Sequence, residues 1–276
     1  MCIEQENRQD IRVLGGFSLI IKMINTQSSV TSTSDPARII LFGIIVWIFS
    51  IQFFIAQVVV HSGWVTPFSL NHNFISDLGN TACGVYPPGS TMYVCSPWHA
   101  WMNTSFILQG FITIIGITFV RKMLPFGMTR FVGVMFLILA GVGDMAVGFF
   151  PENVNNTYHV LGAGVHFILG NFSMIFLGIA LSQAGQSFVT LYSIISGGIG
   201  LVATGFFISK IYLGMGIGGM ERVAAYPLPL WLIVEGIYWL ILGFEDTTPP
   251  EPKNRTRKAG LMMDNPKKHV RSMRVR

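Results

Sequence analysis

Residues 39–60 read IILFGIIVWIFSIQFFIAQVVV, a run without a single charged side chain. Its only strongly polar side chains are Gln52 and Gln57. A helix needs about 20 apolar residues of this kind to cross the hydrocarbon core of a bilayer. A buried helix of a soluble protein would be shorter and would carry a charged face. The stretch therefore predicts a membrane span.

Five further runs have the same character, so we predict an all-α bundle of six transmembrane helices. The expected spans are 39–60, 101–120, 131–150, 159–181, 188–208 and 225–244. Only 11% of the 276 residues are charged, against about 25% in a typical soluble domain. With a mean hydropathy of +0.56, the composition excludes an ordinary soluble enzyme, a disordered protein and a coiled coil.

The basic residues orient this bundle. None of the 18 lysines and arginines falls in an expected span, and 16 of them lie on the side that holds both termini. The positive-inside rule then predicts a cell-membrane protein with cytoplasmic termini. Residues 1–38 would form a cytoplasmic segment whose short apolar run, 11–24, lies along the membrane interface.

Residues 245–276 are rich in proline and then basic, so we expect a disordered cytoplasmic tail. Its charge is typical of a topology anchor that can also attract anionic lipids. Because no folded basic domain is present, the expected partner is the lipid bilayer and not a nucleic acid.

The only long loop on the expected outer side, 61–100, contains Cys83 and Cys95. A disulfide between them fits an oxidising outer compartment. Two free thiols are the first alternative. The second joins both cysteines with His72 and His99 in a zinc site.

Two carboxylates fall inside expected spans, Asp144 in the third and Glu235 in the sixth. Such groups are costly in a membrane and tend to face a bundle interior or a wet cavity. From the helical rise, Asp144 and His166 lie roughly 9 and 10 Å below the same outer surface. Because a short loop joins their spans, we expect these two side chains to meet, with His159 two turns nearer the mouth on the same face.

More polar groups gather at the outer mouth, where five of the six histidines lie. Spans two, four and six begin on this side, so the positive ends of their helix dipoles face the mouth. We therefore expect it to accept an anionic group, such as a carboxylate or a lipid phosphate. The candidate ligand-binding residues are His72, His99, Asn103, Glu221 and Arg222. Ser76, Asp77 and Glu235 are further catalytic candidates.

Four segments between the spans carry a resemblance. They are His72-x3-Ser76-Asp77-Leu78-Gly79, Gly148-Phe149-Phe150-Pro151, His159-x6-His166, and Gly218-Gly219-Met220-Glu221-Arg222 followed by Tyr226-Pro227. In these segments the chain resembles the membrane family called domain of unknown function 998, over residues 38–245. The resemblance implies a multi-span, six-helix protein and supplies no catalytic assignment.

The chain is also similar, in residue types, to the membrane hydrolase superfamily that includes the alkaline ceramidases. Those enzymes place Ser, Asp and His side chains around a metal, and the matching types here are Ser76, Asp77, Asp144, His72, His159 and His166. The chain departs from that pattern because it has six spans instead of seven and lacks a His-x3-His motif on the last one. If the chain binds zinc as those enzymes do, the candidate ligands are Asp144, His159 and His166.

Three functions fit these residues. The first is an enzyme acting on a lipid or other amphiphile, in which Asp144 orients His166, and His166 or His159 acts as base or metal ligand. The second is a transporter or binding protein for a small anionic or amphipathic molecule, with Asp144 and Glu235 as proton or ligand sites. The third is a structural or accessory protein, in which the pair of Asp144 and His166 only fastens two helices. Nucleophilic chemistry at Ser76 is compatible with the residues, although Ser76 has no nucleophile-elbow motif.

Overall fold

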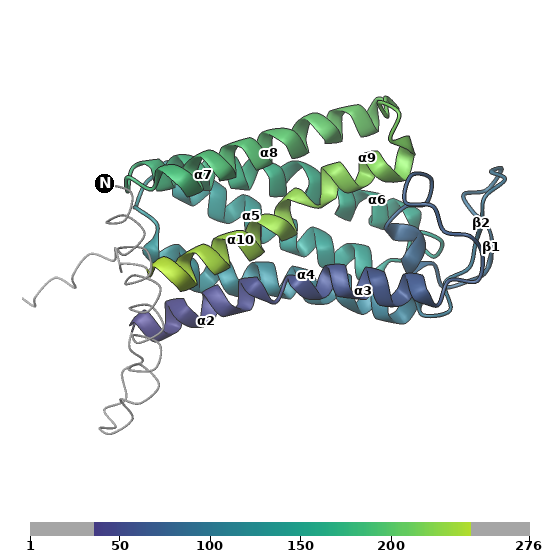
Figure 1. The fold of residues 1–276 in the computed structure, drawn as a ribbon, viewed down its shortest axis with the longest axis horizontal. Helices are drawn as coiled ribbons and strands as arrows, with labels where there is room; N and C mark the ends of the chain where they lie inside the picture. Colours follow the sequence, from purple (N-terminus) through teal and green to yellow (C-terminus); the bar gives the residue numbers. More distant parts are fainter. Residues whose placement is uncertain (1–35, 244–276) are drawn as a thin grey trace, which may run out of the picture.

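The computed structural model describes residues 36–243, and these residues form a bundle of long helices (Figure 1). Six helical segments among them are long and apolar enough to cross a membrane, which confirms the predicted six-helix bundle. The segment 11–24, expected at the interface, and the basic tail, 245–276, lie outside the described residues.

Three spans are single helices or nearly so, and three are interrupted along their length. The second span is α4 (His99–Val120) with the 3₁₀ turn η2 (Arg121–Met123), the third is α5 (Met128–Phe149), and the fifth is α8 (Ser187–Ile208). The first span combines α2 (Pro36–Ile48) and α3 (Ile51–Ser62), and the sixth combines α9 (Gly216–Ala225) and α10 (Pro227–Leu242). The fourth consists of α6 (Asn156–Val165), a π-helical turn η3 (His166–Gly170) and α7 (Asn171–Ser182).

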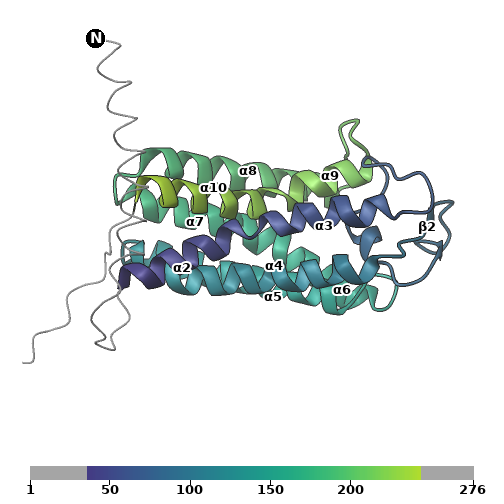
Figure 2. The same cartoon turned by 60° about the horizontal axis from the view of Figure 1, so that its bottom comes forward.

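The six spans form a closed ring in chain order. The first span packs against α4, α4 against α5, α5 against α6 and α7, α7 against α8, and α8 against α9, while α10 returns to α2. The helices run along the long axis of the molecule in both views (Figures 1 and 2). Neighbouring spans are therefore antiparallel, and the ring encloses an interior.

The two ends of the bundle differ. At one end, here called the terminal end, α2 begins and α10 finishes (Figure 2). The other end, here called the hairpin end, is covered by the loop 63–98, which contains the 3₁₀ turn η1 (Ser76–Gly79) and the antiparallel strands β1 (Gly84–Val85) and β2 (Tyr93–Val94). In this loop Cys83 and Cys95 form a disulfide, which confirms the predicted pairing and excludes a zinc site built on these cysteines.

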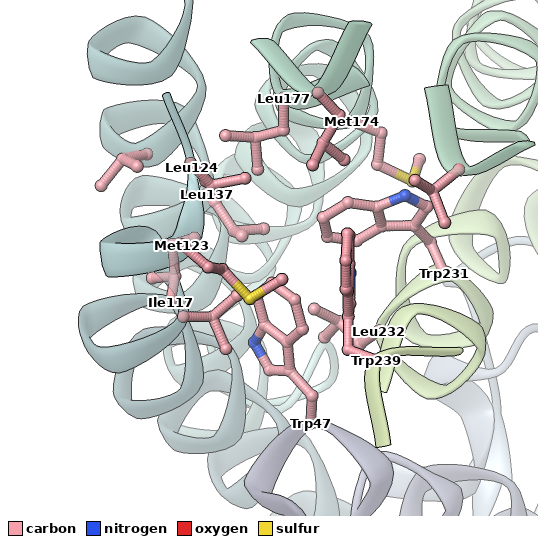
Figure 3. Close-up of a cluster of buried hydrophobic side chains, with 14 of the residues drawn as sticks. Trp47, Ile117, Met123, Leu124, Leu137, Met174, Leu177, Trp231, Leu232 and Trp239 are labelled. Carbon is pink, nitrogen blue, oxygen red and sulfur yellow. The ribbon is translucent and has the colours of Figure 1, made fainter. Parts of the chain in front are cut away.

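The outside of the ring is apolar, and two separate cores fill its interior. Large side chains such as Phe49, Val58 and Ile195 are at least half exposed, as expected for helices surrounded by lipid. The core near the terminal end is built around Trp47 of α2 and Trp231 of α10, whose ring centroids lie 5.4 Å apart (Figure 3). The second core lies under the hairpin end and supports the polar residues described below.

Polar side chains join the first span to the second where α2 gives way to α3. Gln109 of α4 donates to the buried hydroxyl of Ser50 at 3.1 Å. Ser105 donates to Gln52 at 2.8 Å. Interhelical bonds of this kind stabilise helix pairs where no water competes for the polar groups. They explain why Gln52 is tolerated in an otherwise apolar span.

The sixth span begins nine residues earlier than predicted, because α9 starts at Gly216 instead of residue 225. Glu221 and Arg222 therefore lie in a spanning helix, and the expectations that no basic residue and only two carboxylates fall within spans are wrong. The physical reason is that both side chains are buried with partners at the hairpin end. A count of charges along the sequence cannot detect such partners.

Candidate active site

Ser76 and His159 form a hydrogen-bonded pair at the hairpin end. Ser76 begins η1, and His159 lies near the start of α6. His159 Nε2 lies 2.8 Å from Ser76 Oγ, and His159 Nδ1 lies 2.9 Å from the backbone carbonyl oxygen of Phe150. Because a carbonyl can only accept, Nδ1 carries the proton and Nε2 accepts from the serine hydroxyl. A histidine in this state can act as a general base toward the serine.

The turn between α5 and α6 explains why His159 meets the Phe150 carbonyl. Phe150 directly follows the last residue of α5, and Pro151 accepts hydrogen bonds from the backbone N–H groups of Val154 and Asn155. Asn155 then caps α6, because its side-chain oxygen accepts from the N–H of Tyr158 at 3.2 Å. This tight turn returns the chain directly over the end of α5, so the first turn of α6 lies against that carbonyl.

Glu221 of α9 also contacts the segment that carries the serine. Its Oε2 accepts from the backbone N–H of Ile75 at 2.6 Å, and its Oε1 lies 3.4 Å from Ser76 Oγ. The second distance exceeds the usual O–H···O range of about 2.5–3.0 Å. The single hydroxyl proton of Ser76 therefore goes to His159, while Glu221 positions the backbone that carries the serine.

Arg222 fastens the loop 63–98 to α9. Its Nη1 donates to the carbonyl oxygens of Leu70 at 2.9 Å, Asn73 at 2.7 Å and Gly218 at 2.9 Å. The side chain is buried. These contacts tie the loop to α9. Arg222 Nε and Nη2 have no hydrogen-bond partner within residues 36–243, and the ligand-binding role of Arg222 stays a prediction.

Asp77 and Glu152 form a buried carboxyl pair beside the serine. Asp77 Oδ2 accepts from the backbone N–H of Phe74 at 2.8 Å and from the Asn73 side chain at 3.2 Å. Burial raises the pKa of Asp77 despite these bonds. Burial, the charge of Asp77 and a hydrogen bond to Asp77 together raise the pKa of Glu152 well above its usual range. Two buried carboxyls in contact disfavour the doubly charged state, so the pair keeps a proton to a higher pH than a free carboxyl would.

A cavity of about 670 Å³ lies between α6 and α8 and ends at this group of polar residues. Its walls are largely apolar and include Phe167 and Phe207. Val160 and Ile208, which also line it, are 57% and 66% exposed on the outer surface of the bundle. The residues at its polar end are Ser76, Tyr86, Glu152, His159 and Glu221. The cavity thus connects the apolar exterior with the pair of Ser76 and His159.

A second, inner cavity of about 30 Å³ lies on the other side of Ser76 and Glu221 and is bordered by Asp144 and His166. His166 Nδ1 lies 2.7 Å from Asp144 Oδ1, which confirms the predicted meeting of these two side chains. His166 Nε2 lies 3.3 Å from the backbone oxygen of Ala225, to which it donates. His166 thereby joins α5 to the break between α9 and α10, and it makes no bond to His159.

The remaining candidates lie elsewhere. His72 is exposed, His99 Nδ1 lies 2.9 Å from the Ser96 carbonyl oxygen, and Asn103 donates to the Gly79 carbonyl at 2.9 Å. None of these three lines either cavity. Glu235 lies near the terminal end, where its oxygens accept from Ser193 at 3.1 Å and Trp239 at 2.8 Å. Asn103 and Glu235 thereby join separate segments of the bundle, whereas His99 bonds only a residue three positions earlier in the chain.

Over residues 36–243 no three His, Cys, Asp or Glu side chains gather in a way that could hold a metal ion. Asp144 and His166 form one pair and His159 belongs to another. The arrangement of these side chains therefore does not assemble the zinc site that the alkaline-ceramidase likeness suggested.

The sequence analysis did not predict three groups that contribute to the site. Glu152 could have been noticed, because it is the only charged residue in the short loop between the third and fourth spans. No sequence feature singles out Tyr86, whose hydroxyl donates to the Glu152 backbone carbonyl at 2.9 Å. The Phe150 carbonyl could not be found either, because a backbone acceptor leaves no mark in the side-chain pattern.

The model of one protein family, described as Protein of unknown function (DUF998), matches residues 42–238. The chain belongs to this family. The match runs from the first span of the DUF998 protein to the last and includes Ser76, His159 and Glu221, so it agrees with the predicted resemblance. No curated protein and no solved structure matches the chain.

Proposed function

We propose that this protein is a membrane-embedded hydrolase that cleaves an acyl ester of an amphiphile, with Ser76 as nucleophile and His159 as general base. The observation that carries the proposal is the 2.8 Å contact between Ser76 Oγ and His159 Nε2 at the wall of the cavity between α6 and α8. Ligand sites are typically concave and mostly apolar, with a few converging polar groups.

The chemistry follows from the protonation state of His159. Its Nε2 would take the hydroxyl proton as Ser76 Oγ attacks the acyl carbonyl carbon, and would then return that proton to the departing alcohol oxygen. Water would attack the resulting acyl-serine, with His159 taking the proton of water and giving it back to Ser76 Oγ as the acid leaves. Every proton transferred in these reaction steps passes through His159 Nε2, the ring nitrogen that is free to accept a proton.

The shape of the cavity supports an amphiphile as the substrate. Its opening is bordered by Val160 of α6 and Ile208 of α8, both on the apolar exterior of the bundle. A lipid-like molecule could therefore enter sideways from the bilayer, with its chain along the apolar walls and its acyl bond beside Ser76.

We also propose that the hairpin end faces the outside of the cell membrane and that both termini are cytoplasmic. The distribution of basic residues supports this orientation. The disulfide between Cys83 and Cys95 supports it as well, because disulfides persist in oxidising compartments.

Turnover of a chromogenic laurate ester by the purified protein tests the proposal. We expect Ser76→Ala and His159→Gln to lower kcat by roughly a thousandfold or more, as expected when members of one catalytic unit are removed. Ser62→Ala is the matched control, since this serine near the same end is exposed and donates to the Val59 carbonyl of its own helix. Turnover that persists in Ser76→Ala would overturn the proposal.

The alternative of a binding or transport protein rests on the same cavity, because about 670 Å³ can hold a ligand without any reaction. In that case the wild-type protein would bind an amphiphile and hydrolyse none. Binding that is unchanged in Ser76→Ala, together with no ester turnover in the wild type, would favour this alternative.

A further inference from the structure

The polar end of the cavity between α6 and α8 is acidic. Glu152 and Glu221 line it, and no lysine or arginine is among its lining residues. Two basic side chains lie near this end in the described chain. Lys210 is exposed beyond the end of α8. Arg222 donates through Nη1 to backbone carbonyls of the loop and of α9, its Nε and Nη2 have no hydrogen-bond partner within the described residues, and its side chain does not line this cavity.

Three carboxyl groups, Asp77, Glu152 and Glu221, gather at this end, and the positive groups that offset them are Arg222, outside the cavity lining, and one helix N-terminus. Asp77 and Glu152 are two buried carboxyls in contact, and their mutual repulsion and burial raise the pKa of Glu152, while burial raises that of Asp77. The N-terminus of α6, at Asn156, borders the same cavity. A helix N-terminus contributes only about half an elementary charge of positive sign. An anion entering this space would lose its water and meet a like charge.

The hydrogen-bonding groups at this end are mainly acceptors. Glu152 Oε1 is buried and has no donor in the described part of the chain. The hydroxyl proton of Tyr86 already goes to the Glu152 backbone, and the Nδ1 proton of His159 goes to the Phe150 backbone. A ligand head group that donates hydrogen bonds would therefore find acceptors, whereas one that only accepts would find the amide of Asn156 at the rim as the main side-chain donor.

We propose that the cavity takes amphiphiles whose head group donates hydrogen bonds and bears no negative charge, such as a hydroxyl-bearing or ammonium head, and excludes carboxylate and phosphate heads. This inference names the substrate class of the hydrolase proposed above and rests on that proposal. It also reverses the expectation that the positive helix ends would make this mouth a site for anions.

The test compares binding of four amphiphiles that share a lauryl or lauroyl chain and differ in head group. The full-length Ser76→Ala protein, which cannot turn over an ester, is placed in phosphatidylcholine nanodiscs. Monolauroylglycerol, dodecylammonium, laurate and lauroyl lysophosphatidate each compete with a fluorescent monoacylglycerol. We expect the first two to bind at least about tenfold more tightly than the two anions, a ratio that equals about 1.4 kcal/mol.

Removing the carboxylates should narrow this preference. In Ser76→Ala proteins that also carry Glu152→Gln and Glu221→Gln, we expect the ratio of affinities to fall toward one. Glu235→Gln is the matched control, because Glu235 lies in the other core and does not line the cavity. If anions bound as tightly as neutral heads, or if the ratio survived both glutamine substitutions, the inference would be overturned. The hydrolase proposal is judged separately, by ester turnover of the wild-type protein.

Discussion

The imidazole of His159 is fixed by a backbone carbonyl, that of Phe150, where many serine hydrolases use a carboxylate. The carbonyl selects the same tautomer, since it accepts the Nδ1 proton. It stabilises a positively charged imidazole less well than a carboxylate would, because it carries only a partial charge. The pair of Ser76 and His159 should therefore act as a correctly oriented but weaker base.

Asp144 should matter for stability and not for the reaction, because its partner is His166 and not His159. We expect Asp144→Leu, which leaves His166 buried without its partner, to cost about 3–5 kcal/mol. We expect Asp144→Asn, which can still bond the imidazole, to cost less and to keep wild-type ester turnover. Thermal unfolding and turnover, measured on the same preparations, check both. Loss of turnover in Asp144→Asn without loss of stability would instead place Asp144 in the reaction.

The carboxyl pair of Asp77 and Glu152 should make stability depend on pH. Both carboxyls have a pKa in the folded protein above their ordinary values of 3.8 and 4.5. The folded state then binds more protons than the unfolded state, so this contribution is complete below those ordinary values and is lost as the pH rises through the raised ones. We expect the Tm of the wild type to fall over that range.

The matched variants for this pH effect are Glu152→Gln and His72→Gln. The first keeps a neutral hydrogen-bonding side chain at all pH values, so the fall in Tm should become smaller. The second changes an exposed histidine and should leave the fall unchanged. A Tm of Glu152→Gln that falls as steeply as that of the wild type would contradict the assigned pair.

At the scale of elements, the close contact between α5 and α6 places His159 and His166. Gly143 and Gly162 face each other, and a Cβ on Gly162 would lie 2.7 Å from the Gly143 carbonyl oxygen. Small residues of this kind let helix backbones approach in a membrane. The helix that bears both histidines is thus held directly against the backbone of α5.

Gly162→Ala should therefore destabilise the protein by about 1–3 kcal/mol, the usual cost of overpacking. It should also lower ester turnover, since α6 must move and carries His159. Gly164→Ala, two residues along the same helix, is the control, because a Cβ there meets nothing within 4 Å. Thermal unfolding of the two variants checks the difference. Equal stability would show that the contact between α5 and α6 is not close.

Hydropathy predicted that each of the six spans exists, but it did not predict where the helix of a span is interrupted. Uncharged runs specify where a helix can cross lipid, so all six spans were found. The start of α9 was missed because Glu221 and Arg222 have partners in the loop 63–98, which lies far away in sequence. The π-helical turn at His166–Gly170 depends on packing against neighbouring helices and has no local sequence signal.

At the scale of the whole molecule, the proposed orientation can be tested with epitope tags. We expect a tag inserted at Gly89, an exposed position at the hairpin end, to bind antibody on intact cells. A tag after Arg276 should bind only after the membrane is permeabilised, because the basic tail should stay in the cytoplasm. The reverse pattern of accessibility would contradict the proposed topology.

Depth along the membrane also explains which part of the candidate site could be predicted. Asp144 and His166 belong to consecutive spans joined by a short loop, so their equal depth was enough to place them together. Ser76 lies in a long loop whose path is fixed by Arg222, the disulfide and Glu221. Its meeting with His159 could not be read from depth, because a loop of that length has many possible paths.

The most direct test of the account is to find the residue that reacts with a lipid-like fluorophosphonate. The purified wild-type protein is treated with the reagent, digested and analysed by mass spectrometry. We expect a single adduct on Ser76, which is lost in Ser76→Ala and formed much more slowly in His159→Gln. Failure of Ser76 to react, or an equal rate in His159→Gln, would contradict the claim that His159 activates this serine.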